Sequence, residues 1–367
     1  MAFYRKEINE TGKYLRVFGF RIPYSTKFEG ERREARIGGV KIEYWFDEEK
    51  NAKYFKLGER RIYFQKTRKE KHYRLKDSLN DKNCQQILEK ELTPLLGYKP
   101  NLNEPKSFNE KLNWMKLHYK NPLVTTCCDK YAVKEYAKQR IDEKYILPVL
   151  GVWEKAEDVD FSALPDSFAL KVNWSSGYNI IVKDKSRLDI TAARKKINRW
   201  MQPESNSYYD MFNWGYKDMK PVIYAEPYIE QIDGQVYDYK FFFSNGEFIY
   251  MFISTDRLDE EKTLTYTFYD KDFKHMPFTY GNKPNAKPIP EMPKNLDKML
   301  ELAKKLAEPF PFVRVDFYEL DEKTIYLGEM TFYTGGGTLP FSPVSWDWIL
   351  GEKIVLSDSF MDEKKNI

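Results

Sequence analysis

The sequence predicts an α+β protein with a small basic β-meander, a helical segment and two further α+β parts. Three observations support this fold class. Residues 13–64 repeat a pattern of apolar strand, glycine turn and second strand. Two later pairs of apolar segments, at 168–183 and 314–333, have the pattern of strands joined by polar turns. Apolar residues recur at helical spacing in three other segments, 85–96, 108–117 and 296–307.

The first 80 residues differ in charge from the rest of the chain. They contain 21 Lys and Arg against 12 Asp and Glu, although the whole chain carries a net charge of only +4. Within them, Lys13–Tyr24 is similar to Lys53–Phe64, and Arg36–Ile42 is a weaker third copy. A basic, aromatic-rich sheet would hold an acidic sugar chain or dock on the anionic inner face of a membrane. The alternative is a solvated sheet that only supports assembly.

A helical segment is expected between the meander and the remaining strands. The helix over residues 85–96 ends before Gly97, a residue that commonly terminates helices. Ser107 and Glu110 have the spacing of a capping box, which predicts the start of the next helix. The predicted division of the chain is into domains at 1–80, 81–160, 161–230 and 231–367.

The most informative segment is the predicted hairpin over residues 314–333. Its acidic turn, centred near residues 322 and 323, places Asp316 opposite Glu329 and Arg314 opposite Thr331. Because side chains alternate between the two faces of a strand, these four side chains share one face.

This shared face predicts a site for a cation and an anion. Two facing carboxylates repel each other, so such a site usually holds a cation, and oxygen-only ligation suits Mg2+. The guanidinium of Arg314 is suited to donate hydrogen bonds to a phosphate oxygen. The glycine run Gly335, Gly336 and Gly337 lets backbone N–H groups approach an anion closely. Together these features indicate phosphoryl chemistry; the alternative is a surface hairpin whose charges are solvated.

The hairpin over residues 168–183 predicts a phosphate clamp. Its first strand carries Lys171, and its polar turn contains Ser175, Ser176 and Gly177. A lysine beside a flexible loop of this kind can hold and cover a triphosphate. The segment is not a P-loop, because the GxxxxGK[ST] motif is missing. Many ordinary hairpins also contain a lysine and a glycine.

Two further strands complete the set of nucleotide-related segments. An apolar strand at 222–229 runs into a short acidic connector, and another strand follows at 237–243. Backbone groups in such a connector can bind the edge of an adenine, and a carboxylate just after it can bind ribose hydroxyls.

In this order, the segments resemble the ATP-grasp superfamily, in which two α+β subdomains clamp ATP. The order is the lysine of the phosphate loop, a Glu-x-x-Ile hinge, then Arg-x-Asp and Glu-x-Thr. The closer resemblance is to the branch named for teichuronopeptide synthesis, the TupA-like branch, and it covers roughly residues 100–350. It is carried by five stretches: Asp129–Lys134, Leu147–Val152, Leu164–Pro165, Ala225–Ile229 and Gly328–Tyr333.

The resemblance implies a role for each matching position. Lys130 and Lys171 would contact nucleotide phosphates, under a lid loop formed by residues 173–177. Arg314 would stabilise the transferred phosphoryl group. Mg2+ would be bound by Asp316, Glu329 and Thr331. The other nucleotide contacts would come from Lys183, Lys240, the adenine-lining Glu226, Tyr228 and Ile229, and either Glu230 or Asp233 on the ribose.

Two positions depart from the usual family pattern. Most ATP-grasp enzymes have asparagine two residues after the metal-binding glutamate, whereas this chain has Thr331. A threonine hydroxyl can ligate Mg2+, but we expect it to do so more weakly than an amide oxygen. The second departure is Lys240, which we place near the phosphates.

The implied activity is that of an ATP- and Mg2+-dependent carboxylate–amine ligase. The acid would become an acyl phosphate, an amine would attack it, and N–H groups of Gly335 and Gly336 would stabilise the oxyanion. The substrates would be a uronic acid or amino-acid substituent of a bacterial cell-surface polysaccharide, such as a capsule or its precursor, and a small amine. Two alternatives stay open: an ATP-dependent sugar kinase, and a non-catalytic or glycosyl-transfer role in surface-glycan synthesis.

Composition and spacing argue against several other classes. No apolar run reaches the roughly 18 to 20 residues that span a bilayer, and the N-terminus has no signal-peptide pattern, so a cytoplasmic protein is expected. Cys84, Cys127 and Cys128 have neither disulfide nor zinc spacing; we expect buried thiols, with a reactive thiol as the alternative. No nucleic-acid-binding signature is present, so no nucleic-acid partner is expected.

Overall fold

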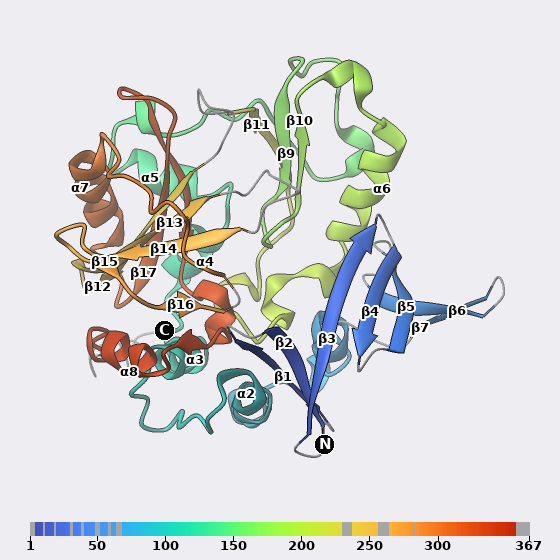
Figure 1. The fold of residues 1–367 in the computed structure, drawn as a ribbon. Coiled ribbons are helices and arrows are strands. Elements are labelled where there is room, and N and C mark those ends of the chain that lie inside the picture. The colour runs from blue at the N-terminus through green and yellow to red at the C-terminus, as the bar shows by residue number, and fades with distance from the viewer. Residues whose placement is uncertain are drawn as a thin grey trace. The chain divides into compact units, whose positions relative to one another are not determined.

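The computed structural model describes the strands between residues 4 and 63, and then residues 68–229, 237–255, 264–281 and 283–356. The chain divides into two compact units, Met1–Arg74 and Leu75–Ile367 (Figure 1). Antiparallel sheets and separate helices build the second unit, so the predicted α+β class is confirmed.

The first unit contains the predicted meander. Seven strands pair in chain order, each antiparallel to the next. The predicted repeats are single hairpins: Arg36 pairs with Lys41, for example, and Lys56 with Arg61. Their glycine turns lie outside the described residues. The elements are β1 (Tyr4–Asn9), β2 (Gly12–Val17), β3 (Phe20–Glu29), β4 (Arg32–Ile37), β5 (Val40–Asp47), β6 (Ala52–Leu57), β7 (Arg60–Tyr63) and the helix α1 (Arg68–Tyr73).

The second unit begins with a helical segment. Its helices are α2 (Asp81–Leu96), α3 (Phe108–His118), α4 (Pro122–Cys128) and α5 (Val133–Lys138). α2 starts four residues earlier than predicted, because the Asn80 side chain accepts a hydrogen bond from the N–H of Asn83 at 3.0 Å and caps the helix there. It ends at Gly97, as expected. The predicted capping box between Ser107 and Glu110 opens α3.

A four-stranded antiparallel sheet follows, with the order β10-β9-β11-β8. It consists of β8 (Gly151–Trp153), β9 (Phe168–Val172), β10 (Asn179–Val182) and β11 (Ile223–Pro227), and helix α6 (Ile190–Trp200) lies between β10 and β11 in the chain. β9 and β10 are the arms of the predicted phosphate-clamp hairpin. We call this sheet the lid sheet.

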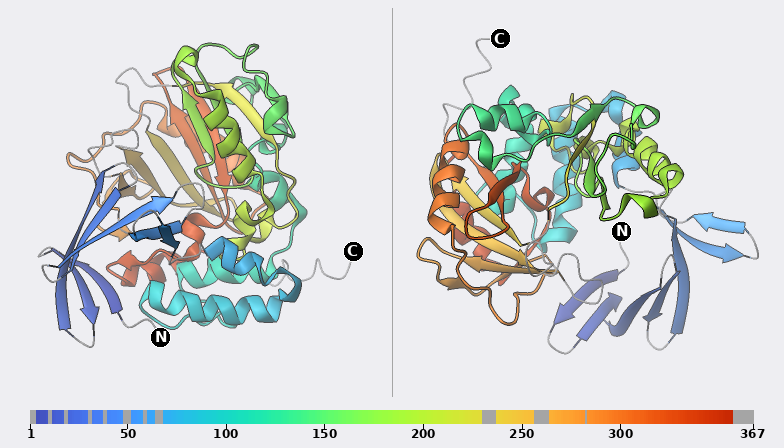
Figure 2. Two further views of the ribbon diagram at one scale, coloured as in Figure 1. Left: turned by 90° about the vertical axis from the view of Figure 1, so that its right-hand side faces the viewer. Right: turned by 90° about the horizontal axis from the view of Figure 1, so that it is seen from above.

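The largest sheet of the second unit has six strands in the order β15-β14-β13-β12-β17-β18. Its strands are β12 (Asp238–Ser244), β13 (Glu247–Thr255), β14 (Thr265–Tyr269), β15 (His275–Met276), β17 (Val313–Glu319) and β18 (Ile325–Thr331). Helix α7 (Leu296–Ala307) packs against β12 and β17 through its predicted apolar face (Figure 2). Two short strands, β16 (Thr279–Tyr280) and β19 (Phe341–Ser342), and helix α8 (Ser345–Glu352) complete the unit.

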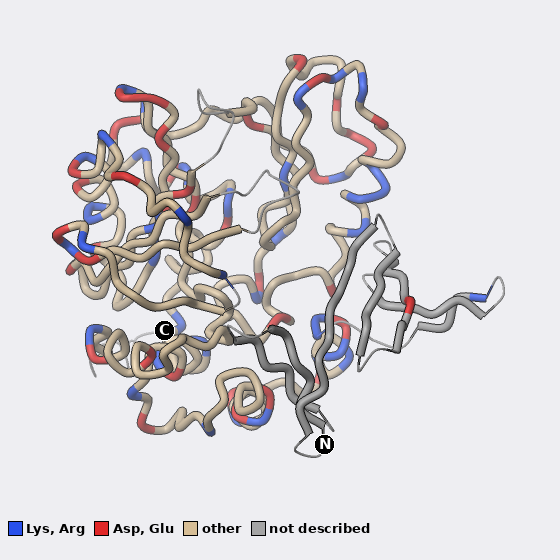
Figure 3. The backbone as a smooth tube through the Cα atoms, in the orientation of Figure 1, with Lys and Arg blue, Asp and Glu red and all other residues tan. Residues whose placement is uncertain are grey.

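Short 3-10 turns connect these elements. They are η1 (Lys76–Ser78), η2 (Glu143–Tyr145), η3 (Ala156–Asp158), η4 (Lys185–Arg187), η5 (Pro203–Ser205), η6 (Ser207–Tyr209), η7 (Trp214–Tyr216) and η8 (Thr334–Gly337). Basic and acidic positions are interspersed along the backbone of the second unit (Figure 3). Within the described residues, no helix has the length and apolar character that crossing a membrane requires.

The three cysteines are buried free thiols, as the sequence predicts. Burial raises the pKa of the Cys127 thiol to about 12 and that of Cys128 well above its ordinary value. Because the thiolate is the reactive form, the alternative of a reactive thiol is not supported at these two positions.

Candidate nucleotide and metal site

The C-terminal hairpin pairs as the sequence predicts. Arg314 lies opposite Thr331 and Asp316 opposite Glu329 in the β17–β18 ladder. After Asp316 the register shifts by one residue, because Gly328 forms a bulge that the sequence did not reveal. A Cβ atom at Gly328 would lie 2.9 Å from the Tyr318 ring, which explains the glycine.

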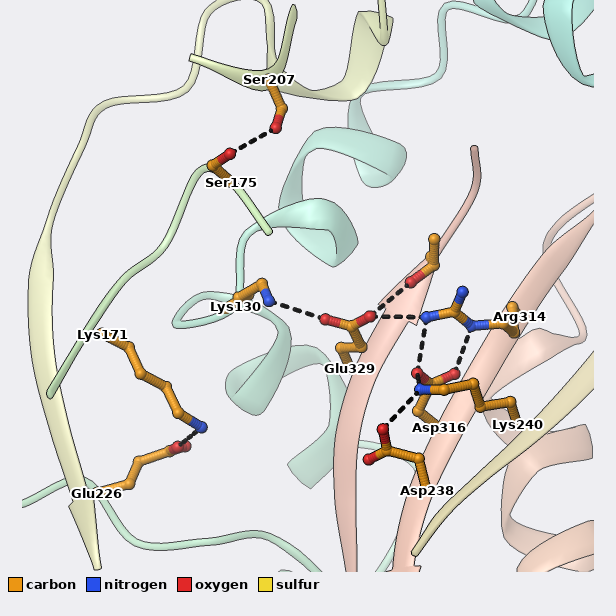
Figure 4. A network of polar contacts seen from close by, with 11 residues as sticks. Lys130, Lys171, Ser175, Ser207, Glu226, Asp238, Lys240, Arg314, Asp316 and Glu329 are labelled. Carbon is orange, nitrogen blue, oxygen red and sulfur yellow. Dashed lines mark hydrogen bonds and ion pairs between the residues drawn. The ribbon is translucent and has the colours of Figure 1, made fainter. Parts of the chain in front are cut away.

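Arg314 neutralises the two facing carboxylates. Its Nε and Nη2 donate to both oxygens of Asp316 at 2.6 and 2.7 Å, and Nη2 also donates to Glu329 Oε1 at 2.7 Å (Figure 4). Burial alone would raise the pKa of Glu329, but Lys130, Arg314 and Lys240 hold it well below its ordinary value. Glu329 is therefore held as an anion. Because Arg314 and Asp316 are buried, the alternative of a solvated surface hairpin is wrong.

Two lysines complete the cluster. Lys130 Nζ lies 2.8 Å from Glu329 Oε2, and Lys240 Nζ lies 2.5 Å from Asp316 Oδ2. Lys240 is placed there because β12 pairs with β17, which puts it opposite Asp316. Its Nζ also lies 3.4 Å from Asp238, a buried carboxylate that the sequence reasoning missed. Three cations thus face three carboxylates.

The donor set fits Mg2+. Asp316 and Glu329 supply carboxylate oxygens, and the Thr331 hydroxyl lies 3.1 Å from Glu329 Oε1. Among the described residues, no group of three or more His, Cys, Asp or Glu is arranged as a complete metal cage. Mg2+ is usually held by one or two carboxylates together with water and substrate phosphates, so an incomplete protein shell suits it.

A rigid turn presents Lys130. It lies between α4 and α5, where Asp129 Oδ1 accepts from the N–H groups of Tyr131 and Ala132 at 2.8 and 3.0 Å. Asp129 Oδ2 accepts from Asn173 Nδ2 at 2.7 Å. Asn173, which is fully buried, also accepts from the Val222 N–H at 2.9 Å. One amide therefore ties the lysine turn to the lid sheet.

The lid sheet holds a second group of charges. Lys171 on β9 forms an ion pair with Oε2 of Glu226 on β11, and Lys134 Nζ of α5 lies 2.5 Å from Oε1 of the same carboxylate. Burial would raise the pKa of Glu226, but the two lysines outweigh it and the pKa lies below its ordinary value. Lys134 lies within the stretch that carries the family resemblance, yet its partner was not predicted.

The predicted lid-loop residues differ in exposure. Ser175 is buried and its hydroxyl lies 3.0 Å from that of Ser207, whereas Ser176 and Gly177 are exposed. Gly177 has a φ of +76°, and a Cβ there would meet no atom within 4 Å. The loop is therefore anchored at its start and open at its tip.

The predicted adenine and ribose contacts are only partly described. Tyr228 lies directly after β11, and Lys183 Nζ is 5.3 Å from the centre of its ring. Ile229 is half-buried. Glu230 and Asp233 lie outside the described residues. The choice between them on the ribose therefore stays a prediction.

The glycine loop is η8, and all three of its glycines have left-handed backbone angles, with φ of +57°, +63° and +58°. The N–H of Gly336 donates to the Tyr333 carbonyl at 2.8 Å. Helix α3 holds the loop from outside: Lys116 Nζ donates to the Gly336 carbonyl at 2.6 Å, and Asn113 Nδ2 to that of Gly337 at 2.8 Å. Asn113 and Lys116 lie three residues apart and so share one face of α3, but nothing in the sequence indicated the glycine loop as their partner.

This chain is similar to several solved structures. Similar solved structures include D-alanine–D-alanine ligase from Bacillus anthracis with ATP (13% identity, 56% of this chain, 55% of that chain, TM-score 0.34). Another is L-amino acid ligase from Bacillus licheniformis (12% identity, 64% and 50%, TM-score 0.41). This chain thus spans about half the length of these proteins. No curated protein matches it.

The family model described as TupA-like ATP-grasp matches residues 110–355. This range includes the lysine turn, the lid sheet, the hairpin and the glycine loop, and it is more than half of the chain. The chain belongs to the TupA-like ATP-grasp family.

Proposed function

We propose that this protein is an ATP-dependent carboxylate–amine ligase that forms an amide through an acyl phosphate. The observation that carries the proposal is the charge cluster of buried Arg314 and Asp316 and half-buried Glu329, with Lys130 and Lys240, on a chain of the ATP-grasp family. Preorganised charge of this kind is the main catalytic resource in phosphoryl transfer.

In this proposal, each part of the cluster has a separate task. Lys130 and Lys171 bind nucleotide phosphates, and Lys240 and Arg314 spread the charge of the transferred phosphoryl group. Asp316, Glu329 and Thr331 hold Mg2+, which when bound supplies charge neutralisation between the phosphates. Because Asp316 holds both Nε and Nη2 of Arg314, the guanidinium is already oriented before substrates arrive.

The acyl-transfer half of the reaction is assigned to the glycine loop. We propose that Gly335 and Gly336 support the oxyanion of the tetrahedral intermediate formed when the amine attacks. Since the Gly336 N–H already donates to Tyr333, this donor would have to be shared or released when the oxyanion forms.

For the substrates, we propose an acidic sugar or amino-acid substituent of a surface polysaccharide and a small amine. Support comes from the excess of basic residues in the first 80 positions and from the family, which is named for teichuronopeptide synthesis. The requirement for ATP favours a cytoplasmic location.

The first experiment is a thermal-shift titration with ATP, with and without Mg2+, on the wild type and on Asp316→Asn. A Mg2+-dependent rise of the melting temperature in the wild type, lost in the variant, would support nucleotide and metal binding at the hairpin. No rise in the wild type would contradict the proposal and favour a degenerate fold.

The second experiment separates a ligase from a kinase. Both produce ADP, but a ligase also releases inorganic phosphate and needs an amine, whereas a kinase keeps the phosphoryl group on its product. ADP formation on a sugar alcohol without amine and without free phosphate would replace the ligase proposal by the kinase alternative.

A further inference from the structure

We propose that Lys134 is a positioning residue for nucleotide binding: it keeps Glu226 paired, so that Lys171 can leave this carboxylate for a phosphate group. The inference rests on the proposed function, in which Lys171 binds the phosphates of ATP. It adds a residue that contacts Glu226 and the Leu147 carbonyl.

The geometry shows one carboxylate shared by two lysines. Glu226 is 4% exposed, and each of its oxygens has its own cation. Lys171 reaches it diagonally across the lid sheet, because Lys171 pairs with Tyr224 and Glu226 lies two residues further along β11. Lys134 reaches it from α5, a separate element.

The two lysines differ in how firmly they are held. The Lys134 side chain is 9% exposed, and its Nζ also donates to the Leu147 carbonyl at 2.8 Å. The Lys171 side chain is 24% exposed, and within the described part of the chain Glu226 is the only partner recorded for its ammonium group. Lys171 is therefore the cation that can move, and Lys134 the one that stays.

The cost of moving Lys171 depends on Lys134. A buried carboxylate without a cation is strongly unfavourable, because desolvation is no longer compensated. With Lys134 in place, Glu226 stays neutralised after Lys171 has turned to a phosphate. Without Lys134, nucleotide binding would have to leave Glu226 unpaired, or Lys171 would remain on Glu226 and not reach the phosphate.

The hairpin repeats this arrangement. Glu329 is also shared, between Arg314, whose side chain is 10% exposed, and Lys130, whose side chain is 22% exposed. In each case a buried cation with a second partner accompanies a more exposed lysine. Figure 4 shows the Lys171–Glu226 pair and the group of Lys130, Glu329 and Arg314. The two more exposed lysines, Lys130 and Lys171, are those to which the proposed function gives the phosphates.

Calorimetric titration with Mg-ATP and with adenosine tests the proposal. Lys134→Met should weaken ATP binding by at least about tenfold, which corresponds to about 1.4 kcal/mol, and should leave adenosine binding unchanged, since adenosine has no phosphate. Lys138→Met is the matched control: Lys138 also lies on α5, but it pairs with the exposed Glu135 and Glu143. It should bind ATP as the wild type does.

A second variant tests the cause. In Lys134→Met with Glu226→Gln, no buried carboxylate is left without a cation when Lys171 moves. The adenine contact that the family resemblance implies for residue 226 is made mostly through its backbone, which the substitution keeps, so ATP affinity should recover to within about threefold of the wild type. If Lys134→Met does not fold, Lys134→Gln replaces it, because glutamine removes the charge but keeps a donor for the Leu147 carbonyl.

The outcomes separate the two proposals. Wild-type ATP affinity in Lys134→Met, equal losses for ATP and adenosine, or no recovery in the double variant would each overturn the role of Lys134 and leave the ligase proposal intact. A wild-type protein that does not bind ATP would overturn both.

Discussion

Replacing Glu329 by glutamine removes one negative charge from the candidate metal site and keeps the shape of the side chain. In the wild type this carboxylate is ionised at neutral pH, because Lys130, Arg314 and Lys240 overcome the effect of burial and hold its pKa well below the ordinary value. The variant therefore loses a full charge at the site where Mg2+ and the phosphates are proposed to bind.

The structure indicates how much Glu329→Gln should change the stability and the turnover. The lost ion pair with Lys130 joins side chains that are 22% and 29% exposed, so it lies between a surface pair and a buried pair. We expect a loss of about 1–2 kcal/mol in the free energy of unfolding, because relief of the repulsion from Asp316 offsets part of the cost. Turnover should fall by at least roughly 100-fold, or about 2.7 kcal/mol in the barrier.

The assay combines thermal unfolding with phosphate release in the presence of acid, amine and Mg-ATP. Glu322→Gln is the control, since Glu322 lies in the turn of the same hairpin with a side chain 77% exposed. The control should match the wild type in both measurements. Wild-type turnover in Glu329→Gln would refute the metal assignment, and loss of the folded state would refute the reasoning about repulsion.

Three further predictions concern stability, measured by urea unfolding. Gly337→Ala should destabilise the protein by about 1 kcal/mol or more beyond Gly336→Ala. Both glycines have a left-handed backbone, but only at Gly337 would a Cβ lie 2.7 Å from the Asn113 side chain. Equal costs for the two variants would contradict this crowding. Asn173→Ala should destabilise the protein by about 3 kcal/mol, roughly 1 for each of its three side-chain hydrogen bonds. Asn179 is exposed, so the control Asn179→Ala should be nearly neutral. The pKa of Glu226 lies below 4.5 in the folded protein, so the contribution of its carboxylate to the free energy of unfolding is complete above that pH and is lost as the pH falls further. The destabilisation caused by Glu226→Gln should therefore shrink in acid. A difference in stability between variant and wild type that does not change with pH would contradict the assignment.

Local rules predicted the parts of the site that depend on short stretches of chain. The period of two and the position of one turn were enough to pair Asp316 with Glu329 and Arg314 with Thr331. The capping box of α3 was equally visible, because its two hydrogen bonds join residues three apart. The bulge at Gly328 was missed, because a register predicted from the centre of the turn alone cannot show an extra residue within a strand.

The sequence by itself therefore determined the family, the α+β class, the hairpins and the identity of most charged residues in the site. Only the tertiary structure decided which charges pair. Lys134 meets Glu226, and Lys240 meets Asp316, because separate elements bring them together. The physical reason is that strand periodicity acts over a few residues, whereas the choice of partner for a buried charge depends on desolvation and on every element packed around it.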